Sequence, residues 1–306
     1  DHHKNIFVAA TDGLRKFSPE GSVLWHHKSY GGLAHAPCLH GSMVFTSHTN
    51  GNLMGLDSHS GRVLWSRRWS KRSPKEGVFP AAHDDLFVFG TEVGDDPRRP
   101  GGAQLAWALD AETGWLRWVF RGDNAFVNFS PIFPGDNSMV LMDFTGMVYR
   151  VNLNNGHLMW KNRGLKSFRS YTEGGAVLGP HKIVYTCSNP GTSYGQEGEK
   201  GVLHAFNLTT GESLWSQELP HPCNSVPSVA EMKGPKKGHS VVVTPGSKLR
   251  KPDLHGSVMA FNAETGALEW RYQAPRLNDI PGASKLYWEG SPNRKEYDGT
   301  CYPQHW

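Results

Sequence analysis

The side chains best suited to chemistry in this sequence are its 16 histidines, which are scattered along the 306-residue chain. Two pairs are adjacent in sequence, His2 with His3 and His26 with His27. Neighbouring residues on a strand point to opposite faces, so neither pair is suited to hold one metal ion jointly. No HExxH, GxSxG or P-loop pattern is present. We therefore predict no catalytic residue and no metal site.

The other reactive side chains are four cysteines: Cys38, Cys187, Cys223 and Cys301. None of them forms a CxxC pair, which argues against a zinc site. An even number of cysteines permits two disulfides, and buried free thiols are the alternative. The spacing leaves both possibilities open.

Composition and charge exclude some classes of protein. Lysine and arginine total 32 against 28 aspartates and glutamates, for a formal net charge of +4, which argues against a dedicated nucleic-acid binder. No run of about 18 or more apolar residues is present, so no transmembrane segment is expected. The 35 glycines, 20 prolines and 11 tryptophans suit many short strands joined by tight turns.

An internal repeat supplies the elements that position these side chains. One pattern occurs six times: a short apolar strand, a turn that ends in glycine, and a tryptophan four residues after that glycine. Such a unit is a hairpin in which the glycine adopts the positive φ of a tight turn. The tryptophan lies on the returning strand, where its ring can pack against the neighbouring repeat. The six tryptophans are Trp25, Trp65, Trp118, Trp160, Trp215 and Trp270.

Two further strand-like runs precede each hairpin. In one repeat they are residues 130–133 and 139–142, and in another they are residues 36–39 and 43–45. The repeat is therefore four antiparallel strands, A to D, in about 40 residues, which is one propeller blade. The predicted fold class is all-β, a β-propeller of four-stranded antiparallel blades.

The repeat resembles a known family. The motif A-x-D-x-x-T-G-x-x-x-W, complete from Ala108 to Trp118, resembles the repeat of pyrroloquinoline-quinone (PQQ) proteins. Residues 205–215 and 260–270 match with asparagine in place of aspartate, and the copies that end at Trp65 and Trp160 match more loosely. In that family these tryptophans dock blade against blade, so the resemblance implies a structural role for all six.

The number of blades depends on the two ends of the repeat array. The first repeat begins at strand B, with residues 6–9, and lacks strand A. The tail, residues 271–306, holds no further hairpin motif and ends in a segment, residues 301–306, typical of the approach to another blade. Proteins with this repeat commonly close with eight blades. We expect a single propeller domain over residues 1–306 that is part of an eight-bladed propeller, with six or seven blades as alternatives.

Strand order divides the loops of such a propeller between two faces. The A–B and C–D turns form one face, here called the turn face, and the D–A and B–C loops form the other, here called the loop face. The loop face holds three long insertions, residues 92–102, 189–200 and 245–256. Insertions that collect on one face often mark a binding face. The arginines predicted to contact a partner there are Arg67, Arg68, Arg98, Arg99, Arg163, Arg169 and Arg250.

Two functions are consistent with this sequence. The first is a non-catalytic propeller, without cofactor, that binds another protein or an anionic ligand and acts as a scaffold in a larger assembly. The family's scaffold members in bacterial outer-membrane assembly act in this way. The alternative implied by the resemblance is a quinoprotein dehydrogenase that uses PQQ and Ca²⁺ to oxidise alcohols or sugars. Family dehydrogenases often place a disulfide between adjacent cysteines beside PQQ, and no adjacent cysteines occur here.

The resemblance also implies a location outside the cytoplasm, where relatives with this repeat mostly work. Two segments fit the N-glycosylation pattern, Asn128-Phe129-Ser130 and Asn207-Leu208-Thr209. Both are compatible with such a location.

Overall fold

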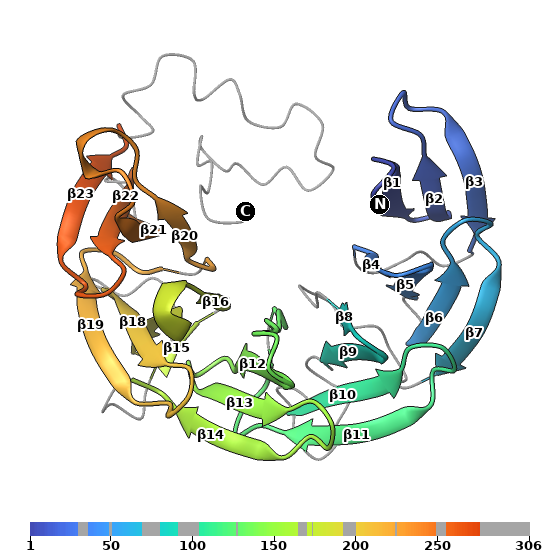
Figure 1. Ribbon diagram of the computed structural model, residues 1–306, viewed down its shortest axis with the longest axis horizontal. Helices are drawn as coiled ribbons and strands as arrows, with labels where there is room; N and C mark the ends of the chain where they lie inside the picture. The colour runs from blue at the N-terminus through green and yellow to red at the C-terminus, as the bar shows by residue number, and fades with distance from the viewer. Residues whose placement is uncertain are drawn as a thin grey trace, which may run out of the picture. The chain divides into compact units, whose positions relative to one another are not determined.

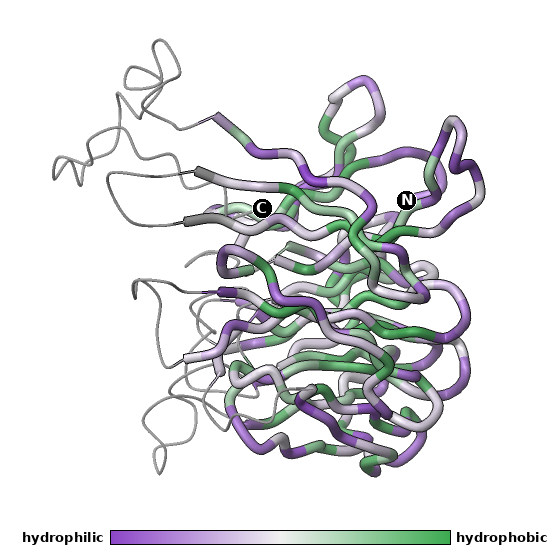
Figure 2. The backbone as a smooth tube through the Cα atoms, turned by 90° about the vertical axis from the view of Figure 1, so that its left-hand side faces the viewer, coloured by the Kyte–Doolittle hydropathy of each residue, from purple (hydrophilic) through white to green (hydrophobic). Residues whose placement is uncertain are grey.

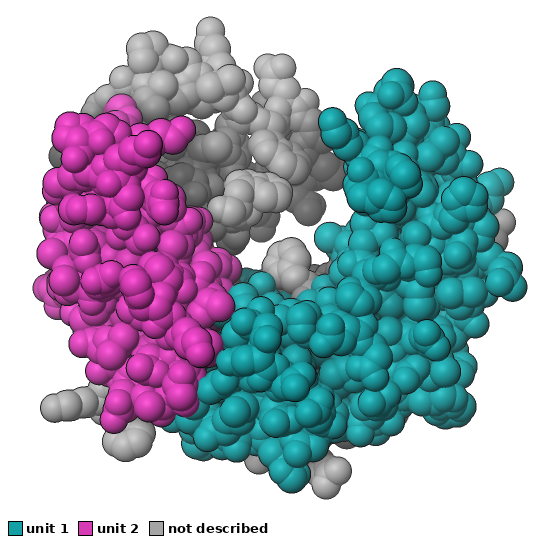
Figure 3. Space-filling model, viewed as in Figure 1, with its two compact units in different colours: residues 1–161 teal, residues 162–306 magenta. Residues whose placement is uncertain are grey.

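The computed structural model describes residues 1–29, 36–48, 51–68, 80–90, 104–126, 128–164, 170–172, 174–191, 200–223, 225–248 and 255–275. Within these residues the only helices are two short 3-10 turns, Pro180–Lys182 and Gly234–Lys236. All other regular structure is antiparallel β-sheet, so the predicted all-β class is confirmed. The chain divides into two compact units, residues 1–161 and 162–306 (Figure 3). The blade number and the single domain stay predictions.

Unit 1 contains four antiparallel sheets that follow one another in chain order (Figure 1). Sheet 1 has β1 (Ile6–Ala10), β2 (Gly13–Phe17) and β3 (Val23–Lys28). Sheet 2 has β4 (Cys38–His40), β5 (Met43–Ser47), β6 (Asn52–Asp57) and β7 (Val63–Arg68). Sheet 3 has β8 (Ala81–His83), β9 (Leu86–Gly90), β10 (Leu105–Asp110) and β11 (Leu116–Arg121). Sheet 4 has β12 (Ser138–Met142), β13 (Val148–Asn152) and β14 (Leu158–Asn162).

Unit 2 contains two sheets. Sheet 5 has β15 (Ser170–Tyr171), β16 (Ala176–Leu178), β17 (Ile183–Pro190), β18 (Gly201–Asn207) and β19 (Ser213–Leu219). Sheet 6 has β20 (Ser228–Glu231), β21 (Ser240–Lys248), β22 (His255–Asn262) and β23 (Leu268–Gln273). Sheets 2, 3 and 6 have the predicted order A-B-C-D, and sheet 1 lacks strand A as expected.

Two sheets depart from the simple four-strand pattern at strand A. In sheet 4 the expected strand over residues 130–133 is a single bridge, in which Ile132 and Val140 exchange backbone hydrogen bonds of 3.0 and 2.9 Å. In sheet 5 strand A is split, because β15 and β16 pair with successive parts of β17. The inner strand is therefore the least regular position of the repeat.

Aspartate or asparagine closes the C–D turn, as the motif indicates. The carboxylate of Asp110 accepts hydrogen bonds from the backbone N–H and the hydroxyl of Thr113, at 2.9 and 2.7 Å, and Gly114 takes a φ of +70°. In sheet 6 the side chain of Asn262 accepts the N–H of Thr265 at 2.9 Å. These side-chain bonds add to the backbone hydrogen bonds of the same turns, in which Gly114 donates to Asp110 at 2.8 Å and Gly266 donates to Asn262 at 2.9 Å.

The tryptophan of one repeat reaches the turn of the next. The indole N–H of Trp65 donates to the backbone carbonyl of Ala111 at 2.8 Å, and that of Trp118 donates to Leu153 at 2.6 Å. The Trp65 ring lies over Gly114 so closely that a Cβ on that glycine would meet ring atoms at 2.5 Å. The glycine is therefore required twice, for its positive φ and for the space that the ring occupies.

The same contact between tryptophan and glycine recurs at two more seams, where a seam is the junction of two consecutive sheets. Trp25 donates to Ser58 and lies over Gly61, and in unit 2 Trp215 donates to Ala263 and lies over Gly266. Trp65 and Trp118 are buried, whereas Trp25, Trp160 and Trp215 are half-buried. Trp270 is 39% exposed, and the residues after 275 lie outside the described ones, so its docking role stays a prediction.

The core lies between consecutive sheets. In unit 1 the buried side chains of sheet 3, including Val88 and Phe120, pack against Met139, Leu141 and Val151 of sheet 4. Every residue of β5, β9 and β12 is buried, because these strands are covered on both faces. Figure 2 shows hydrophobic and hydrophilic segments alternating along the backbone.

Candidate partner-binding face

The loop face lies where the second and fourth strands of each sheet end. Of the seven arginines predicted there, Arg67 and Arg68 are the last residues of β7, and Arg163 follows β14. The remaining predicted arginines lie outside the described residues: Arg98, Arg99, Arg169 and Arg250. The first long insertion lies wholly outside them, as do residues 192–199 of the second and residues 249–254 of the third. The described ends of the third insertion belong to β21 and β22.

The guanidinium of Arg67 contacts the C–D turn of the next repeat. Its guanidinium carbon lies 4.5 Å from the centre of the Trp115 ring, and its Nη2 donates to the carbonyl of Thr113 at 3.1 Å. Both residues belong to the C–D turn of sheet 3, which is on the turn face. A cation–π contact and a hydrogen bond thus hold the long side chain against the turn of the next repeat, and a partner contact of Arg67 stays a prediction.

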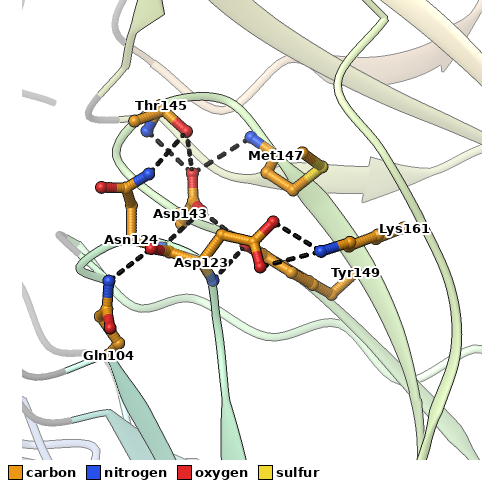
Figure 4. Close-up of polar contacts among 8 residues, drawn as sticks. All are labelled: Gln104, Asp123, Asn124, Asp143, Thr145, Met147, Tyr149 and Lys161. Carbon is orange, nitrogen blue, oxygen red and sulfur yellow. Dashed lines mark hydrogen bonds and ion pairs between the residues drawn. The ribbon is translucent and has the colours of Figure 1, made fainter. Parts of the chain in front are cut away.

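The described part of the loop face is organised by a buried carboxylate, Asp143, directly after β12 (Figure 4). Its Oδ1 accepts the N–H and the hydroxyl of Thr145, both at 2.8 Å, and the N–H of Met147 at 3.2 Å. These bonds close the B–C turn of sheet 4 from within.

The same carboxylate ties sheet 4 to the segment that leaves sheet 3. Its Oδ2 accepts the N–H of Asn124 at 3.2 Å and the hydroxyl of Tyr149 at 2.6 Å. The Tyr149 oxygen in turn accepts the N–H of Asp123 at 2.7 Å. Burial, and then the neighbouring Asp143 charge, raise the pKa of Tyr149, so the hydroxyl keeps its proton and its place in the network.

Five donors thus surround the two oxygens of Asp143, at least two on each. A carboxylate offers about four lone-pair sites, so all of them are taken. Asp143 is therefore a structural organiser of this face.

Charged side chains around this network are paired. The Lys161 ammonium lies 2.8 and 2.7 Å from the two oxygens of Asp123, and both side chains are about two-fifths exposed. In unit 2 Lys200 pairs with Glu218 at the loop-face ends of β18 and β19. Exposed pairs of this kind add little stability, yet they cancel much of the local positive charge.

A second link of this kind connects sheets 1 and 2. Ser29, which follows β3, contacts the Nε2 of His48 at the end of β5, and both side chains are buried. Burial lowers the pKa of His48. The segment that leaves one sheet is thus tied to the B–C end of the next sheet at two places in unit 1.

In unit 2 a disulfide joins two segments of the loop face. Cys187 on β17 is bonded to Cys223 in the segment that leaves β19, with Cα atoms 6.0 Å apart. The N–H of Cys223 also donates to the side-chain oxygen of Asn189 at 2.8 Å. Of the possibilities left open by the sequence, one disulfide and one free thiol, Cys38, are present, and Cys301 lies outside the described residues. Burial raises the pKa of the Cys38 thiol to about 12, so it is a poor nucleophile.

Among the described histidines of unit 2, His204 is the most deeply buried. Its ring nitrogens lie 3.0 Å from the hydroxyls of Ser188 and of Ser216, on the neighbouring strands. Burial lowers its pKa to about 4. The ring is therefore neutral and acts as a polar bridge inside sheet 5.

This histidine makes stability depend on pH. In the unfolded chain this histidine binds a proton below its ordinary pKa of 6.5, whereas in the folded chain it stays neutral down to about pH 4. The free energy of unfolding should therefore fall as the pH drops from 6.5 to about 4. The loss should reach about 3 kcal/mol at most. Urea denaturation across this interval should show a shallower decline for His204→Gln than for the native chain. A matched change at the exposed His157 should leave the decline intact, and an equal effect of both changes would contradict the assignment.

The turn face carries the basic cluster Lys233, Lys236 and Lys237 around the second 3-10 turn. Lys236 pairs with Glu269 and lowers the pKa of that carboxyl.

Of the two glycosylation sequons, Asn207 uses its side-chain oxygen to cap a C–D turn, accepting the N–H groups of Thr209 and Thr210. These positions hold the turn face in shape.

Among the described residues no group of three or more histidine, cysteine, aspartate or glutamate side chains is arranged to hold a metal ion. Calcium takes about six to eight oxygen ligands, and the buried carboxylate of Asp143 already accepts five hydrogen bonds.

Across the part of the chain that the structure describes, no helix has the length and apolar character needed to cross a bilayer.

The sequence matches the protein family described as outer membrane protein assembly factor BamB over residues 10–169 and again over residues 145–286. The chain belongs to this family. The recognition of a PQQ-type repeat from the tryptophan motif is thereby confirmed. The two overlapping matches agree with a repeat that continues through both units.

Individual relatives are distant. A polyvinylalcohol dehydrogenase from Sphingopyxis sp. is 24% identical over 240 residues, which are 67% of this chain and 35% of that protein. The BamB of Shewanella oneidensis is 25% identical over 193 residues, 59% of this chain and 47% of that protein. The matches therefore span about a third and about half of these relatives.

The crystal structure of BamB from Moraxella catarrhalis superposes with a TM-score of 0.61 at 16% identity, covering 88% of this chain and 70% of that one. At this identity the likeness shows the fold alone, and it supports the predicted β-propeller.

The sequence reasoning missed the Asp143 network. A signal was present, since Asp143 follows an apolar strand and stands two residues before a threonine and three before a glycine. That arrangement is typical of a turn closed by an aspartate side chain. Its link to Asp123 and Tyr149 depends on tertiary packing and has no local signature.

Proposed function

We propose that this chain is a non-catalytic propeller that acts as a binding and scaffold module in a larger assembly and meets a protein partner through its loop face. The proposal rests on one observation: in this chain of the BamB family, the segments that form the loop face are fixed to one another. Its B–C turns and its D–A segments are fixed to one another by Asp143, by the Ser29–His48 contact and by the Cys187–Cys223 disulfide. A surface ordered in advance loses less entropy when a partner binds.

Charge pairing favours a protein over an anionic ligand. The Lys161–Asp123 and Lys200–Glu218 pairs offer alternating charges rather than a positive field. Alternating charges suit the polar rim of a protein interface, where they set orientation and association rate. We therefore assign the partner as a protein.

The location we propose is extracytoplasmic. The printed name of the BamB relatives places them in outer membrane protein assembly. The Cys187–Cys223 disulfide agrees with an oxidising compartment, where such bonds form and persist.

The dehydrogenase alternative rests on one observation, the 24% identity to polyvinylalcohol dehydrogenase. It is the weaker proposal, because the buried carboxylate of the described loop face is fully used by hydrogen bonds. Incubation with PQQ and Ca²⁺, followed by a dye-reduction assay with alcohols and sugars, should give no turnover. Turnover would overturn the scaffold proposal in favour of a quinoprotein.

The scaffold proposal is tested by photo-crosslinking in the native cell. A photoreactive amino acid is placed at Arg121 or Lys200, which are exposed on the loop face, or at Glu112 or Glu212, which are exposed on the turn face. The loop-face positions should give a discrete protein adduct and the turn-face positions should not. Adducts from the turn face alone would show that the wrong face was chosen.

A further inference from the structure

The two N-glycosylation sequons lie in different surroundings. Asn207-Leu208-Thr209 begins the C–D turn of sheet 5, on the turn face, and Asn128-Phe129-Ser130 lies between β11 and β12. The third residue of a sequon carries the hydroxyl that the pattern requires. Thr209 is exposed, whereas Ser130 is half-buried. The sequon of the turn therefore places its hydroxyl residue at the surface.

The repeat accounts for Asn207 but not for Thr209. Five of the six C–D turns begin with aspartate or asparagine, as the repeat motif indicates. The motif places threonine three residues later, and Thr210 holds that position in this turn. Two residues after the aspartate or asparagine, the other four turns have histidine, glutamate or asparagine. The sequon therefore needs a residue, Thr209, that the fold of the turn does not require.

The cap of this turn fixes the side-chain amide of Asn207. Its Oδ1 accepts the backbone N–H groups of Thr209 and Thr210 at 2.8 and 3.1 Å, and only the oxygen of an amide can accept them. Among the described residues, Nδ2 of Asn207 has no hydrogen-bond acceptor. Nδ2 is the atom that carries the sugar in an N-linked glycan. The cap is compatible with that modification, because it uses the oxygen alone.

Hydrogen bonds from neighbouring segments fix the backbone of the turn. Leu208 is 2% exposed, and its N–H donates to the carbonyl of Lys182 at 2.8 Å. The Nδ2 of Asn162 donates to the carbonyl of Gly211 at 2.7 Å. These contacts leave Thr209 exposed. A glycan on this turn would therefore be attached to an ordered base at the protein surface.

We propose that Asn207 is an N-glycosylation site, an inference that rests on the extracytoplasmic location proposed above. In the reaction, Nδ2 forms a bond to the first sugar carbon of a lipid pyrophosphate-linked oligosaccharide. The bond between that carbon and the pyrophosphate breaks, the lipid pyrophosphate leaves, and Nδ2 gives up one proton. The glycan is bulky and hydrophilic. It covers the turn face at sheet 5 and leaves the loop face open for the protein partner.

The first test is mass spectrometry of the native protein from its own cells. A peptide N-glycosidase in heavy-oxygen water converts a glycosylated asparagine into labelled aspartate. Trypsin cleavage without reduction should then give residues 183–200 and 201–233 as one pair of peptides, joined by Cys187 and Cys223. This pair reports the disulfide and position 207 together. The label is expected at position 207, and an unlabelled Asn207 would overturn the proposal.

The same pair of peptides separates two kinds of failure. An intact Cys187–Cys223 disulfide with an unlabelled Asn207 would overturn the glycan and leave the extracytoplasmic location standing. Free thiols at both cysteines with an unlabelled Asn207 would count against both proposals. A label at Asn128 and none at Asn207 would show that the wrong sequon was chosen.

Variants made in the same cells test the sequon itself. Thr209→Val removes the sequon hydroxyl and keeps the cap, which uses the backbone N–H of residue 209. This change should abolish the label at Asn207, and Thr209→Ser, which restores a hydroxyl, should keep it. Thr210→Val is the matched control, because this neighbouring threonine is equally exposed and lies outside the sequon. The control should keep the label.

Two further outcomes would decide against the assignment. Equal loss of the label in Thr209→Val and Thr210→Val would show that modification follows the shape of the turn, and a label retained in Thr209→Val would show that the sequon is not read. Circular dichroism should show an unchanged fold for each variant. Loop-face crosslinking from Lys200 should be the same in Thr209→Val as in the native chain, because the glycan lies on the other face.

Discussion

Trp118→Ala is expected to lower the free energy of unfolding by about 3–5 kcal/mol, the usual cost of replacing a large buried aromatic side chain with alanine. The ring is 7% exposed and lies over Gly156 of sheet 4. Its indole N–H donates to the Leu153 carbonyl at 2.6 Å, so the change leaves both a cavity and an unpaired buried carbonyl. Urea denaturation followed by circular dichroism measures the loss.

The matched control for that experiment is Trp115→Ala, only three residues away. Trp115 is 63% exposed and contacts Arg67 alone among aromatic and cationic groups of the described residues. Its removal should cost about 1 kcal/mol or less, the value of an exposed cation–π contact. Equal losses for the two variants would show that the tryptophan seams do not hold the sheets together.

The repeat could be predicted because its signal is local. The spacing of glycine and tryptophan encodes a turn and the returning strand, both of which are set by neighbours in sequence. The motif at Asp110 to Trp118 therefore predicts the hairpin of β10 and β11 and the placement of the tryptophan on β11. Six copies of one local signal were enough to indicate the fold class.

Strand A was harder to predict because it is short and pairs on one side only. Residues 130–133 read as a strand, yet only the Ile132–Val140 bridge forms there. In sheet 5 the inner position is divided between β15 and β16. Strand A makes few hydrogen bonds to its neighbour, so its β-propensity has little influence on its conformation. The path of the segment that leads into the sheet decides its conformation instead.

The candidate site was predicted only in outline. Counting arginines in loops gave Arg67 a loop-face role, but the position of a long side chain depends on what lies beside it, here Trp115 of the next repeat. The partner of Cys187 could not be read from four cysteines, because their number does not fix the pairing. The role of Asp143 was missed because it depends on hydrogen bonds from Asn124 and Tyr149. Tertiary packing places these two donors beside Asp143.

Loss of the Cys187–Cys223 disulfide is expected to lower the free energy of unfolding by about 4 kcal/mol, since the bond closes a long loop in the unfolded chain. The two cysteines are 36 residues apart in sequence and both are fully buried. The bond removes conformations from the unfolded ensemble and, in the folded state, holds the segment after β19 against β17. The double change Cys187→Ala with Cys223→Ala avoids a buried unpaired thiol and is measured by urea denaturation.

Two controls separate the bond from the packing of its sulfur atoms. Cys38→Ala removes a half-buried free thiol and should cost clearly less than the double change. A reducing agent should bring the native chain close to the stability of the double variant and should leave the double variant unchanged. If reduction had no effect while the double variant lost stability, the loss would come from the cavity left by the side chains, and the disulfide would contribute nothing through the unfolded state. If neither treatment cost more than about 1 kcal/mol, the loop it closes would already be restricted in the unfolded chain.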